Sequence, residues 1–570
     1  MLSLEHALTQ YKLWLNDPLI DEQTKSELLS LQGNEKELED RFYRDLEFGT
    51  GGLRGVIGAG TNRMNRYTVA KATQGLAQFV SKQADGRRPS VAIAYDSRNQ
   101  SPEFALEAAL VLAGNGVKAY VFESLRPTPE LSFAVRHLGS SGGIVITASH
   151  NPPEYNGYKV YGKDGGQLVP RDAEQVLAEI GTVASLAQVR RVSREEAEAS
   201  GLLQWIGADI DEAFVQAVSG VSLHPDVVKK VSDRFHILYT PLHGAGNRSV
   251  RAVLERIGFG NVHVVPEQEQ PDPQFSTVKS PNPEEREAFT IALSMARQTN
   301  ADIIIGTDPD CDRMGAVVQN DTGEFVVLNG NQSGAIMAYY VLDGLKRRGE
   351  LPDNGVLVKT IVTSEMGAVI AESFGVRVMN TLTGFKYIGE KMTEFEQTGQ
   401  YRFLFGYEES YGYLAGTYCR DKDAVLASML ICEAAAYYKN EGKTLYDVLQ
   451  ELYRTYGYFR EQLESRTMKG KDGLEKIGGI MEDWRSNPPA AVADVPVVRV
   501  QDYLHGIDGL PAENVLKYTL ADDSWFCLRP SGTEPKIKMY FAVRGSSEEE
   551  AGARLDRLRA AVMSRVDQFQ

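Results

Sequence analysis

The chain has 570 residues, of which 42% are hydrophobic and 24% are charged, a composition that is typical of folded globular proteins and too apolar for a disordered one. At about 100–200 residues per domain, this length predicts three to five domains. The net charge of −16 disfavours nucleic acid or an anionic membrane as the main partner, because both require a basic surface.

The cysteines are few and far apart, namely Cys311, Cys419, Cys432 and Cys527. They form no CxxC pair, which argues against a zinc site or a disulfide scaffold and fits a reducing cytosol. The N-terminal segment has no basic region followed by an apolar region and a cleavage site, so we expect no signal peptide. No apolar run is long enough to predict a membrane helix. We therefore expect a cytoplasmic protein that binds neither nucleic acid nor membrane.

In chain order, residues 1–45 predict helix, because Leu4, Leu8, Tyr11 and Leu15 recur at helical spacing. Beyond them, short apolar runs that end in small or polar loops alternate with helical stretches. Continuous apolar runs suit strands that are buried on both faces, so the alternation predicts α/β units with mixed or parallel sheets. The runs are 90–98, 142–152, 235–246, 301–313, 355–366 and 401–410.

These runs fall into three pairs, which we interpret as three structurally similar α/β domains. Further along, residues 444–457 predict a helix, and residues 476–496, with their paired prolines, predict a connector. Alternating strands follow, before a closing helix at 546–566 with Ser546 or Ser547 as its N-cap. The predicted class is α/β, with mixed sheets in three similar domains and a smaller α+β C-terminal domain. The predicted domains are 1–205 (including the N-terminal helical extension), 206–320, 321–455 and 456–570.

In such sheets, ligand groups gather at the carboxyl ends of the strands. The loop at 147–152, Thr-Ala-Ser-His-Asn-Pro, places Ser149 directly after a strand, where its hydroxyl can face a cleft. A simple polar turn is the alternative, because Asn151-Pro152 is a turn signal. The GxSxG elbow of hydrolases is absent from this loop.

An acidic loop follows a later strand and carries Asp308, Asp310 and Asp312 at alternate positions. Three carboxylates this close repel one another unless a cation binds. Oxygen ligands with room for a phosphate oxygen favour Mg²⁺. Arg313 and Gln319 stand where a calcium-binding EF-hand needs glycine and glutamate, so that motif is disfavoured. A solvated acidic turn is the alternative.

Two later loops could bind a phosphosugar. Glu408 and Ser410, in the loop 406–412, can bond to sugar hydroxyls, although a solvated turn fits equally well. The segment 529–536, Arg-Pro-Ser-Gly-Thr-Glu-Pro-Lys, combines a planar guanidinium with hydroxyl and backbone donors and predicts an anion cradle, with a plain strand connection as the alternative.

Further cations accompany these loops: Arg54 in a glycine-rich turn, Lys159 ten residues after Ser149, and Lys422 in the charged run 420–423. Arg54 or Lys159 could support a transferring phosphate, and either could equally be structural, whereas the run 420–423 by itself favours a charged surface segment.

Taken together, the loops resemble those of the α-D-phosphohexomutase superfamily. The shared motifs occur in the family's order and are TASHNP (147–152), DPDCDR (308–313), GYEES (406–410) and RPSGTEPK (529–536). The resemblance covers residues from about 40 to 570. LTGFKYIGE (382–390), PTPELSFAVR (127–136) and the N-terminal extension resemble the bacterial phosphoglucomutase/phosphomannomutase family. This resemblance implies four domains in a heart-shaped arrangement around a central cleft.

The resemblance also implies roles for individual residues. Ser149 would carry the phosphoryl group and would bind Mg²⁺ together with Asp308, Asp310 and Asp312. The implied catalytic residues are Ser149, Lys159, Arg54, His150 and Lys422, with Lys159 as the expected general acid/base and Lys422 as its competitor. The implied substrate-binding residues are Glu408, Ser410, Thr383, Gly384, Arg529, Ser531, Gly532, Thr533 and Arg313. The chain departs from the commonest pattern at Gly51 and at Tyr407, and the second departure bears on sugar specificity.

The implied reaction is the interconversion of glucose 1-phosphate and glucose 6-phosphate through a phosphoserine enzyme, an isomerase that uses glucose 1,6-bisphosphate as intermediate and activator. A preference for mannose or pentose phosphates, or bisphosphate synthesis, stays open, because epimers differ by one hydroxyl. A HAD-type phosphatase with Asp308 as nucleophile and an inactive sugar-phosphate-binding regulator are competing hypotheses. Cys311 argues against the phosphatase, whose motif expects Thr or Val there. The expected partner is a small phosphosugar, and the expected state is monomer or dimer.

Overall fold

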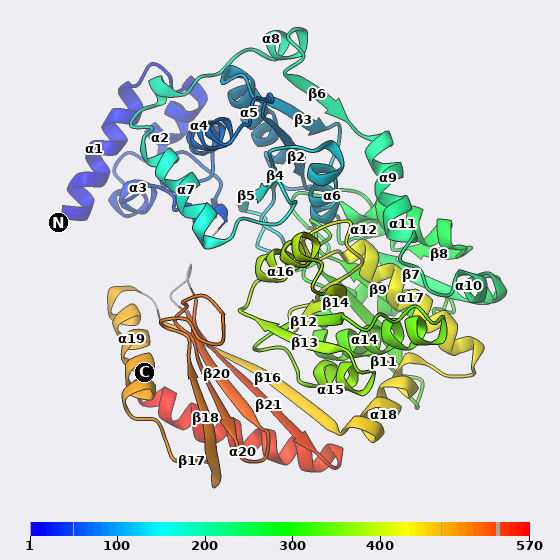
Figure 1. Ribbon diagram of the computed structural model, residues 1–570. Helices are drawn as coiled ribbons and strands as arrows, with labels where there is room; N and C mark the ends of the chain where they lie inside the picture. Colours follow the sequence, from blue (N-terminus) through cyan, green and yellow to red (C-terminus); the bar gives the residue numbers. More distant parts are fainter. Residues whose placement is uncertain (1, 50, 469, 532–535, 570) are drawn as a thin grey trace.

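The computed structural model describes residues 2–49, 51–468, 470–531 and 536–569. Four units follow one another around an arc, from the N-terminal helices to the C-terminal sheet (Figure 1). The first three units each contain a mixed sheet and the fourth an antiparallel sheet, which confirms the predicted fold class. No helix within the described ranges has both the length and the apolar character needed to span a membrane.

The first unit begins with the expected helical extension and continues with a six-stranded sheet in the order β1-β5-β4-β2-β3-β6. Its helices are α1 (Leu2–Asn16), α2 (Glu22–Ser30), α3 (Glu35–Phe42), α4 (Arg66–Lys82), α5 (Ser101–Gly114), α6 (Thr128–Leu138), α7 (Pro170–Gly181) and α8 (Arg194–Ala199). Its strands are β1 (Gly52–Val56), β2 (Ser90–Tyr95), β3 (Lys118–Phe122), β4 (Gly142–Ile146), β5 (Tyr155–Gly162) and β6 (Leu203–Ile206).

The second sheet has the order β11-β10-β9-β7-β8. Its strands are β7 (His236–Thr240), β8 (Asn261–Val264), β9 (Ile303–Thr307), β10 (Met314–Gln319) and β11 (Phe325–Leu328), and its helices are α9 (Ala208–Ser219), α10 (Pro225–Val231), α11 (Gly246–Ile257), α12 (Pro266–Glu269) and α13 (Thr290–Met295). The expected boundary at residue 320 is too early, because β11 pairs with β10 and completes this sheet. The second unit therefore extends to residue 328.

The third sheet has the order β13-β12-β14-β15. Its strands are β12 (Gly355–Thr360), β13 (Arg377–Thr381), β14 (Arg402–Glu408) and β15 (Gly412–Ala415), and its helices are α14 (Gly330–Arg347), α15 (Met366–Ser373), α16 (Phe385–Thr398), α17 (Ala424–Asn440) and α18 (Leu445–Tyr456). Helix α17 is buried along nearly its whole length and packs against elements of both the second and the third unit. One continuous apolar core therefore joins these two units.

The fourth sheet has the order β16-β21-β20-β19-β18-β17. Its strands are β16 (Tyr458–Thr467), β17 (Ala491–Val492), β18 (Val495–Asp502), β19 (Leu516–Leu520), β20 (Trp525–Pro530) and β21 (Lys536–Gly545), with helices α19 (Gly470–Ser486) and α20 (Glu548–Val566). The prediction of a connector at 476–496 is wrong over its first half, which belongs to α19. Ile477, Ile480 and Trp484 recur at helical spacing on that helix and are buried.

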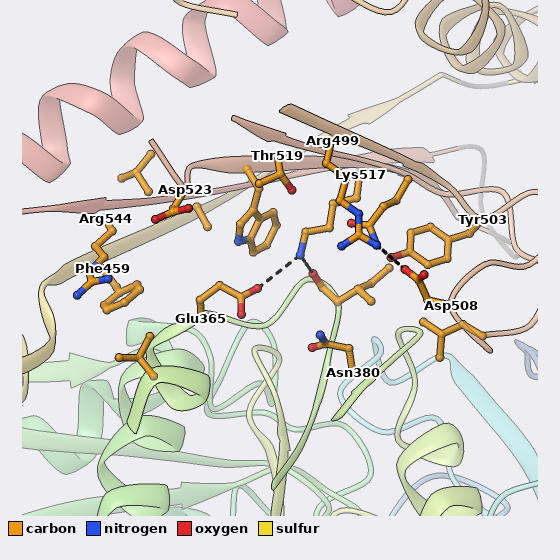
Figure 2. A pocket seen from close by; sticks show the side chains of 17 residues that line it. Glu365, Asn380, Phe459, Arg499, Tyr503, Asp508, Lys517, Thr519, Asp523 and Arg544 are labelled. Carbon is orange, nitrogen blue, oxygen red and sulfur yellow. Dashed lines mark hydrogen bonds and ion pairs between the residues drawn. The ribbon is translucent and has the colours of Figure 1, made fainter. Parts of the chain in front are cut away.

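The third and fourth units meet at an interface that lines an open pocket of about 480 Å³ (Figure 2). The ammonium of Lys517, on β19, donates to the carbonyl of Ile361 at 2.7 Å and lies 3.5 Å from a carboxylate oxygen of Glu365. Arg499 bonds instead to Asp508 of its own unit at 2.8 Å. At this pocket, the buried Lys517 therefore makes polar contacts with the third unit, whereas Arg499 does not.

The expected strands place the loops that carry chemistry. Every residue of β4 and β9 is buried, as continuous apolar runs require. The serine loop follows β4, the acidic loop follows β9, and Glu408 is the last residue of β14. These loops come from three different sheets, so only the packing of the units can bring them together.

Candidate active site

A cleft of about 800 Å³ is lined by residues of all four units. It contains Ser149 from the first unit, Asp312 from the second, Glu408 from the third and Arg529 from the fourth. The other expected residues that line it are Arg54, His150, Lys159, Arg313, Thr383, Gly384, Ser410, Lys422 and Ser531. Asp308 and Asp310 are fully buried and do not line this cleft. Gly532 and Thr533 lie outside the described residues.

Ser149 lies at the first-unit edge of the cleft with little of its surface exposed. Its Oγ donates to Oδ2 of Asp308 at 2.7 Å. Its φ of 51° is in the left-handed region, which residues with a Cβ rarely adopt. The hydroxyl expected to carry chemistry is therefore in direct contact with the acidic loop.

The carboxylates of Asp308, Asp310 and Asp312 each offer an oxygen within 4.8 Å of the others. Oδ1 of Asp308 is used inside the loop, where it accepts from the backbone N–H of Asp312 and of Arg313 at 3.1 and 3.0 Å. Oδ1 of Asp310 and Oδ1 of Asp312 are buried and have no hydrogen-bond partner within the described part of the chain. Two buried oxygens without hydrogen-bond partners, beside a third carboxylate, fit a hard divalent cation.

Electrostatics in the cluster support the same conclusion. Burial, followed by repulsion from Asp310 and Asp312, holds the pKa of Asp308 well above its usual range. Burial also opposes ionisation of Asp312, but Lys422 and Lys159 outweigh it and lower the pKa of that carboxyl. The buried carboxyl groups of the cluster therefore cannot all ionise by themselves, and added positive charge would reduce their mutual repulsion.

Two lysines supply part of that charge. Lys159, on β5, lies 3.0 Å from Oδ2 of Asp310 and 3.5 Å from Oδ2 of Asp312. Lys422 lies 2.9 Å from Oδ2 of Asp312. Burial disfavours the charge on Lys422, but Asp312 and Asp421 outweigh this effect and raise its pKa. Both lysines thus reach the acidic loop from units other than the one that carries it.

His150 lies beside the serine, with Nδ1 at 3.3 Å from Oγ of Ser149 and 3.1 Å from a guanidinium nitrogen of Arg313. Burial, together with the charges of Arg313 and Arg54, lowers the pKa of His150 to about 3. The imidazole is therefore neutral near pH 7. Arg54 donates to the side chain of Asn151 at 3.3 Å, so its cation lies next to the same loop.

The third unit contributes a polar corner to the cleft. Oε1 of the buried Glu408 accepts from the backbone N–H of Gly384 at 2.8 Å. Gly384 has a φ of 122°, which a side chain would make strained. The hydroxyl of Thr383 is buried without a hydrogen-bond partner among the residues described, so it can serve a ligand. Burial raises the pKa of Glu408.

Tyr407, which departs from the commonest sequence of the family's sugar-binding loop, does not face the cleft. Because side chains alternate along a strand, Tyr407 points away from the side used by Glu408. Its ring is buried against Gly334 and Gly367, which have no side chains to clash with it. These two glycines therefore leave room for the Tyr407 ring inside the third unit.

The fourth unit supplies cations to the same cleft. Arg529, on β20, donates to Glu513 at 3.0 Å, and Lys538 on β21 is its direct neighbour across the sheet. Sequence reasoning missed Lys538, although Lys536 and Lys538 alternate on one strand and therefore share a face. It also missed Thr128, which donates to Oδ2 of Asp310 at 2.9 Å from another unit.

Comparisons with known proteins agree with this architecture. Four family models match in order: "Phosphoglucomutase/phosphomannomutase, alpha/beta/alpha domain I" at residues 45–186, domain II at 212–323, domain III at 329–456 and the C-terminal domain at 480–561. The phosphoglucomutase of Staphylococcus haemolyticus (strain JCSC1435) is 38% identical over 525 residues, which cover 90% of this chain and 93% of that protein. The phosphoglucomutase of Staphylococcus epidermidis (strain ATCC 35984) is 36% identical over 542 residues, covering 93% and 96%.

A solved structure shows the same fold. It is the open form of the exocytosis-sensitive phosphoprotein pp63/parafusin, a phosphoglucomutase from Paramecium. It superposes with a TM-score of 0.71 at 16% identity, over 93% of this chain and 96% of that one. Since the matched models span most of the sequence and the relatives match nearly end to end, the chain belongs to the phosphoglucomutase/phosphomannomutase family.

Proposed function

We propose that this chain is a phosphoglucomutase, which interconverts glucose 1-phosphate and glucose 6-phosphate with Ser149 as the phosphoryl carrier. The observation that carries the proposal is the 2.7 Å contact between Oγ of Ser149 and Asp308, within an acidic cluster beside a cleft shared by four units. The curated relatives at 36–38% identity carry the same name.

The metal in this proposal is Mg²⁺, held by Asp308, Asp310 and Asp312 together with an oxygen on Ser149. When bound, it would neutralise negative charge that develops on the transferring phosphoryl group. The buried Oδ1 atoms of Asp310 and Asp312, which have no hydrogen-bond partner in the described part of the chain, support this assignment.

In the proposed reaction, Arg529, Ser531 and the segment that includes Gly532 and Thr533 hold the phosphate of glucose 1-phosphate, and Glu408 and Ser410 bond to the sugar hydroxyls. The O6 hydroxyl then attacks the phosphorus on Ser149, and the bond from phosphorus to Oγ breaks as the new bond to O6 forms. The glucose 1,6-bisphosphate that results turns over in the cleft. Its other phosphoryl group returns to Oγ of Ser149, which leaves glucose 6-phosphate.

A group must take the proton from O6 in the first step and return one in the second. We assign this role to Lys159, which lines the cleft from the same unit as Ser149, and Lys422 is the competing candidate, because both ammonium groups contact the acidic loop. Arg54, His150 and Arg313 border the transferring phosphoryl group in this proposal. Transfer of this kind depends mainly on positioning and on neutralising charge.

The contacts favour Ser149 as the residue that carries the phosphoryl group. A HAD-type phosphatase would use Asp308 instead. Asp308 is fully buried beneath Ser149, and Ser149 rather than Asp308 lines the cleft.

The small-molecule partner in this proposal is a phosphosugar. Its sugar, a monomeric or dimeric state and a cytoplasmic location stay predictions. Comparing kcat/KM for glucose, mannose and ribose 1-phosphates, with catalytic bisphosphate present, would identify the preferred sugar.

The test of the proposed function is Ser149→Ala, compared with Ser81→Ala on the exposed surface of α4. We expect the first variant to keep its fold and to lose at least about 10³-fold of the mutase activity, because the covalent carrier is gone. The control should retain wild-type activity. A coupled assay for glucose 6-phosphate measures the activity, and peptide mass spectrometry locates the phosphate. Full activity of Ser149→Ala, or phosphate on Asp308, would overturn the proposal.

A further inference from the structure

The serine loop is held in a conformation that costs free energy. The left-handed region is less stable than the right-handed region for a residue with a Cβ, because the Cβ comes too close to the following carbonyl oxygen. Ser149 adopts this conformation, and in it Oγ points at Asp308. Other contacts must therefore hold the backbone of Ser149 in place.

The guanidinium of Arg98 makes most of these contacts. Arg98 follows β2 and is 2% exposed. It donates to the backbone carbonyls of Ser149 at 2.6 Å, Pro152 at 2.8 Å and Tyr155 at 3.1 Å, and also to that of Asn151. All four acceptors belong to the loop between β4 and β5 or to the first residue of β5. One planar cation thus bonds to four backbone carbonyls between Ser149 and Tyr155.

The N–H of Ser149 is held by a second route. It donates to Oγ1 of Thr147 at 2.8 Å, and that hydroxyl donates to Oδ2 of Asp96 at 2.6 Å. Asp96 also accepts from the backbone N–H of Arg98 at 2.9 Å. Both peptide groups that flank Ser149 are therefore fixed, one by Thr147 and the other by Arg98.

The loop is also tied to the unit that carries the acids. The guanidinium carbon of Arg98 lies 5.0 Å from the ring centre of Phe275, a buried residue of the second unit. The contact is of the cation–π type. Arg98 therefore links the serine loop to the second unit without lining the cleft itself.

We propose that Arg98, assisted by Thr147, is a positioning residue for the phosphoryl-carrying serine. By holding Ser149 in the left-handed conformation, it aims Oγ at the acidic cluster. This inference rests on the proposed function of Ser149. A purely structural role for Arg98 would lower stability and activity together, whereas a positioning role lowers the rate of phosphoryl transfer in a folded enzyme that still binds its substrate.

The test compares Arg98→Lys, Arg98→Ala and Thr147→Val with Arg63→Lys, a control at another buried arginine of the first unit that bonds to Asp40. Circular dichroism and thermal unfolding establish which variants fold. Steady-state kinetics separate kcat from KM. Mass spectrometry follows the rate at which glucose 1,6-bisphosphate phosphorylates Ser149.

We expect Arg98→Ala to lose about 10²-fold or more in kcat and in the phosphorylation rate, since small misplacements of a reacting atom have effects of that size. The KM should stay within threefold, because the sugar-binding residues belong to other units. Arg98→Lys should be intermediate, since one ammonium can replace only some of the four bonds. Added guanidinium ion should restore part of the activity of Arg98→Ala. Thr147→Val should lose about tenfold in kcat, and Arg63→Lys should match wild type.

The inference is overturned if folded Arg98 variants phosphorylate Ser149 at the wild-type rate, or if their kcat and KM change as in Arg63→Lys. Should both Arg98 variants fail to fold, Thr147→Val decides, and an unchanged kcat in that variant rejects the inference. A wild-type enzyme that never acquires phosphate on Ser149 would instead refute the proposed function.

Discussion

At the scale of single residues, Asp310 shows how the acidic cluster depends on a cation. One carboxylate oxygen bonds to Thr128 and Lys159, and the other is buried with no hydrogen-bond partner in the described ranges. A buried unpaired carboxylate oxygen is unfavourable unless something positive binds to it. The cluster is therefore organised for a ligand rather than for stability alone.

We expect Asp310→Asn to lower activity by about 10³-fold, and added Mg²⁺ should not restore it, because a formal charge and a ligand are both lost. Mg²⁺ should raise the melting temperature of the wild-type protein by binding the folded state, and should raise that of the variant less. Asp321→Asn, in an exposed turn, is the control. Equal stabilisation of wild type and Asp310→Asn by Mg²⁺ would contradict the metal assignment.

At the scale of secondary-structure elements, α19 contributes to the core of the fourth unit. Trp484 is buried on this helix, and its ring packs edge-on against Tyr518 and Phe526 of the sheet. Leu474, near the start of the same helix, is 59% exposed. Only one face of α19 therefore stabilises the unit.

Trp484→Ala should reduce the free energy of unfolding of the fourth unit by about 3–5 kcal/mol, since it leaves a cavity and removes aromatic contacts. Leu474→Ala should change it by less than about 0.5 kcal/mol. Urea unfolding, followed by tryptophan fluorescence and circular dichroism, measures both. If the two variants have the same unfolding midpoint, α19 does not contribute as the contacts suggest.

At the scale of the whole molecule, Arg529 can bind a substrate held by the other units only when the fourth unit is correctly placed. Lys517 is one polar link that crosses to the third unit, through Ile361 and Glu365 (Figure 2). Its ammonium also lies over the ring of Trp525, with Nζ at 4.1 Å from the ring centre. Losing one such hydrogen bond typically costs about 1 kcal/mol.

Lys517→Met should therefore shift the balance toward more open arrangements and raise the KM for the sugar phosphate by about fivefold, because a smaller fraction of the enzyme can bind. Small-angle X-ray scattering should show a larger radius of gyration for the free variant. Arg499→Met is the matched control, since Arg499 lines the same pocket but bonds within its own unit. An unchanged KM together with unchanged scattering would refute this role for Lys517.

Local patterns predicted the elements well, because they depend on neighbours in the chain. The apolar runs before Ser149, Asp308 and Glu408 became buried strands, and Ser547 caps the last helix as expected. The prediction of a connector at 476–496 was wrong because two local signals conflict there. The prolines after residue 486 suggested a connector, although apolar residues at helical spacing upstream make α19 a helix.

The sequence by itself determined the fold class, the order of the loops and the family, because strand burial and motif order are written along the chain. Tertiary structure alone decided that the hydroxyl of Ser149 lies 2.7 Å from Asp308, 159 residues away, and that Arg98 holds the backbone behind it. The physical reason is that hydrophobic burial, which packs the units, acts between segments without regard to their separation in sequence. Residues such as Arg98 and Thr128 acquire their roles only from that packing.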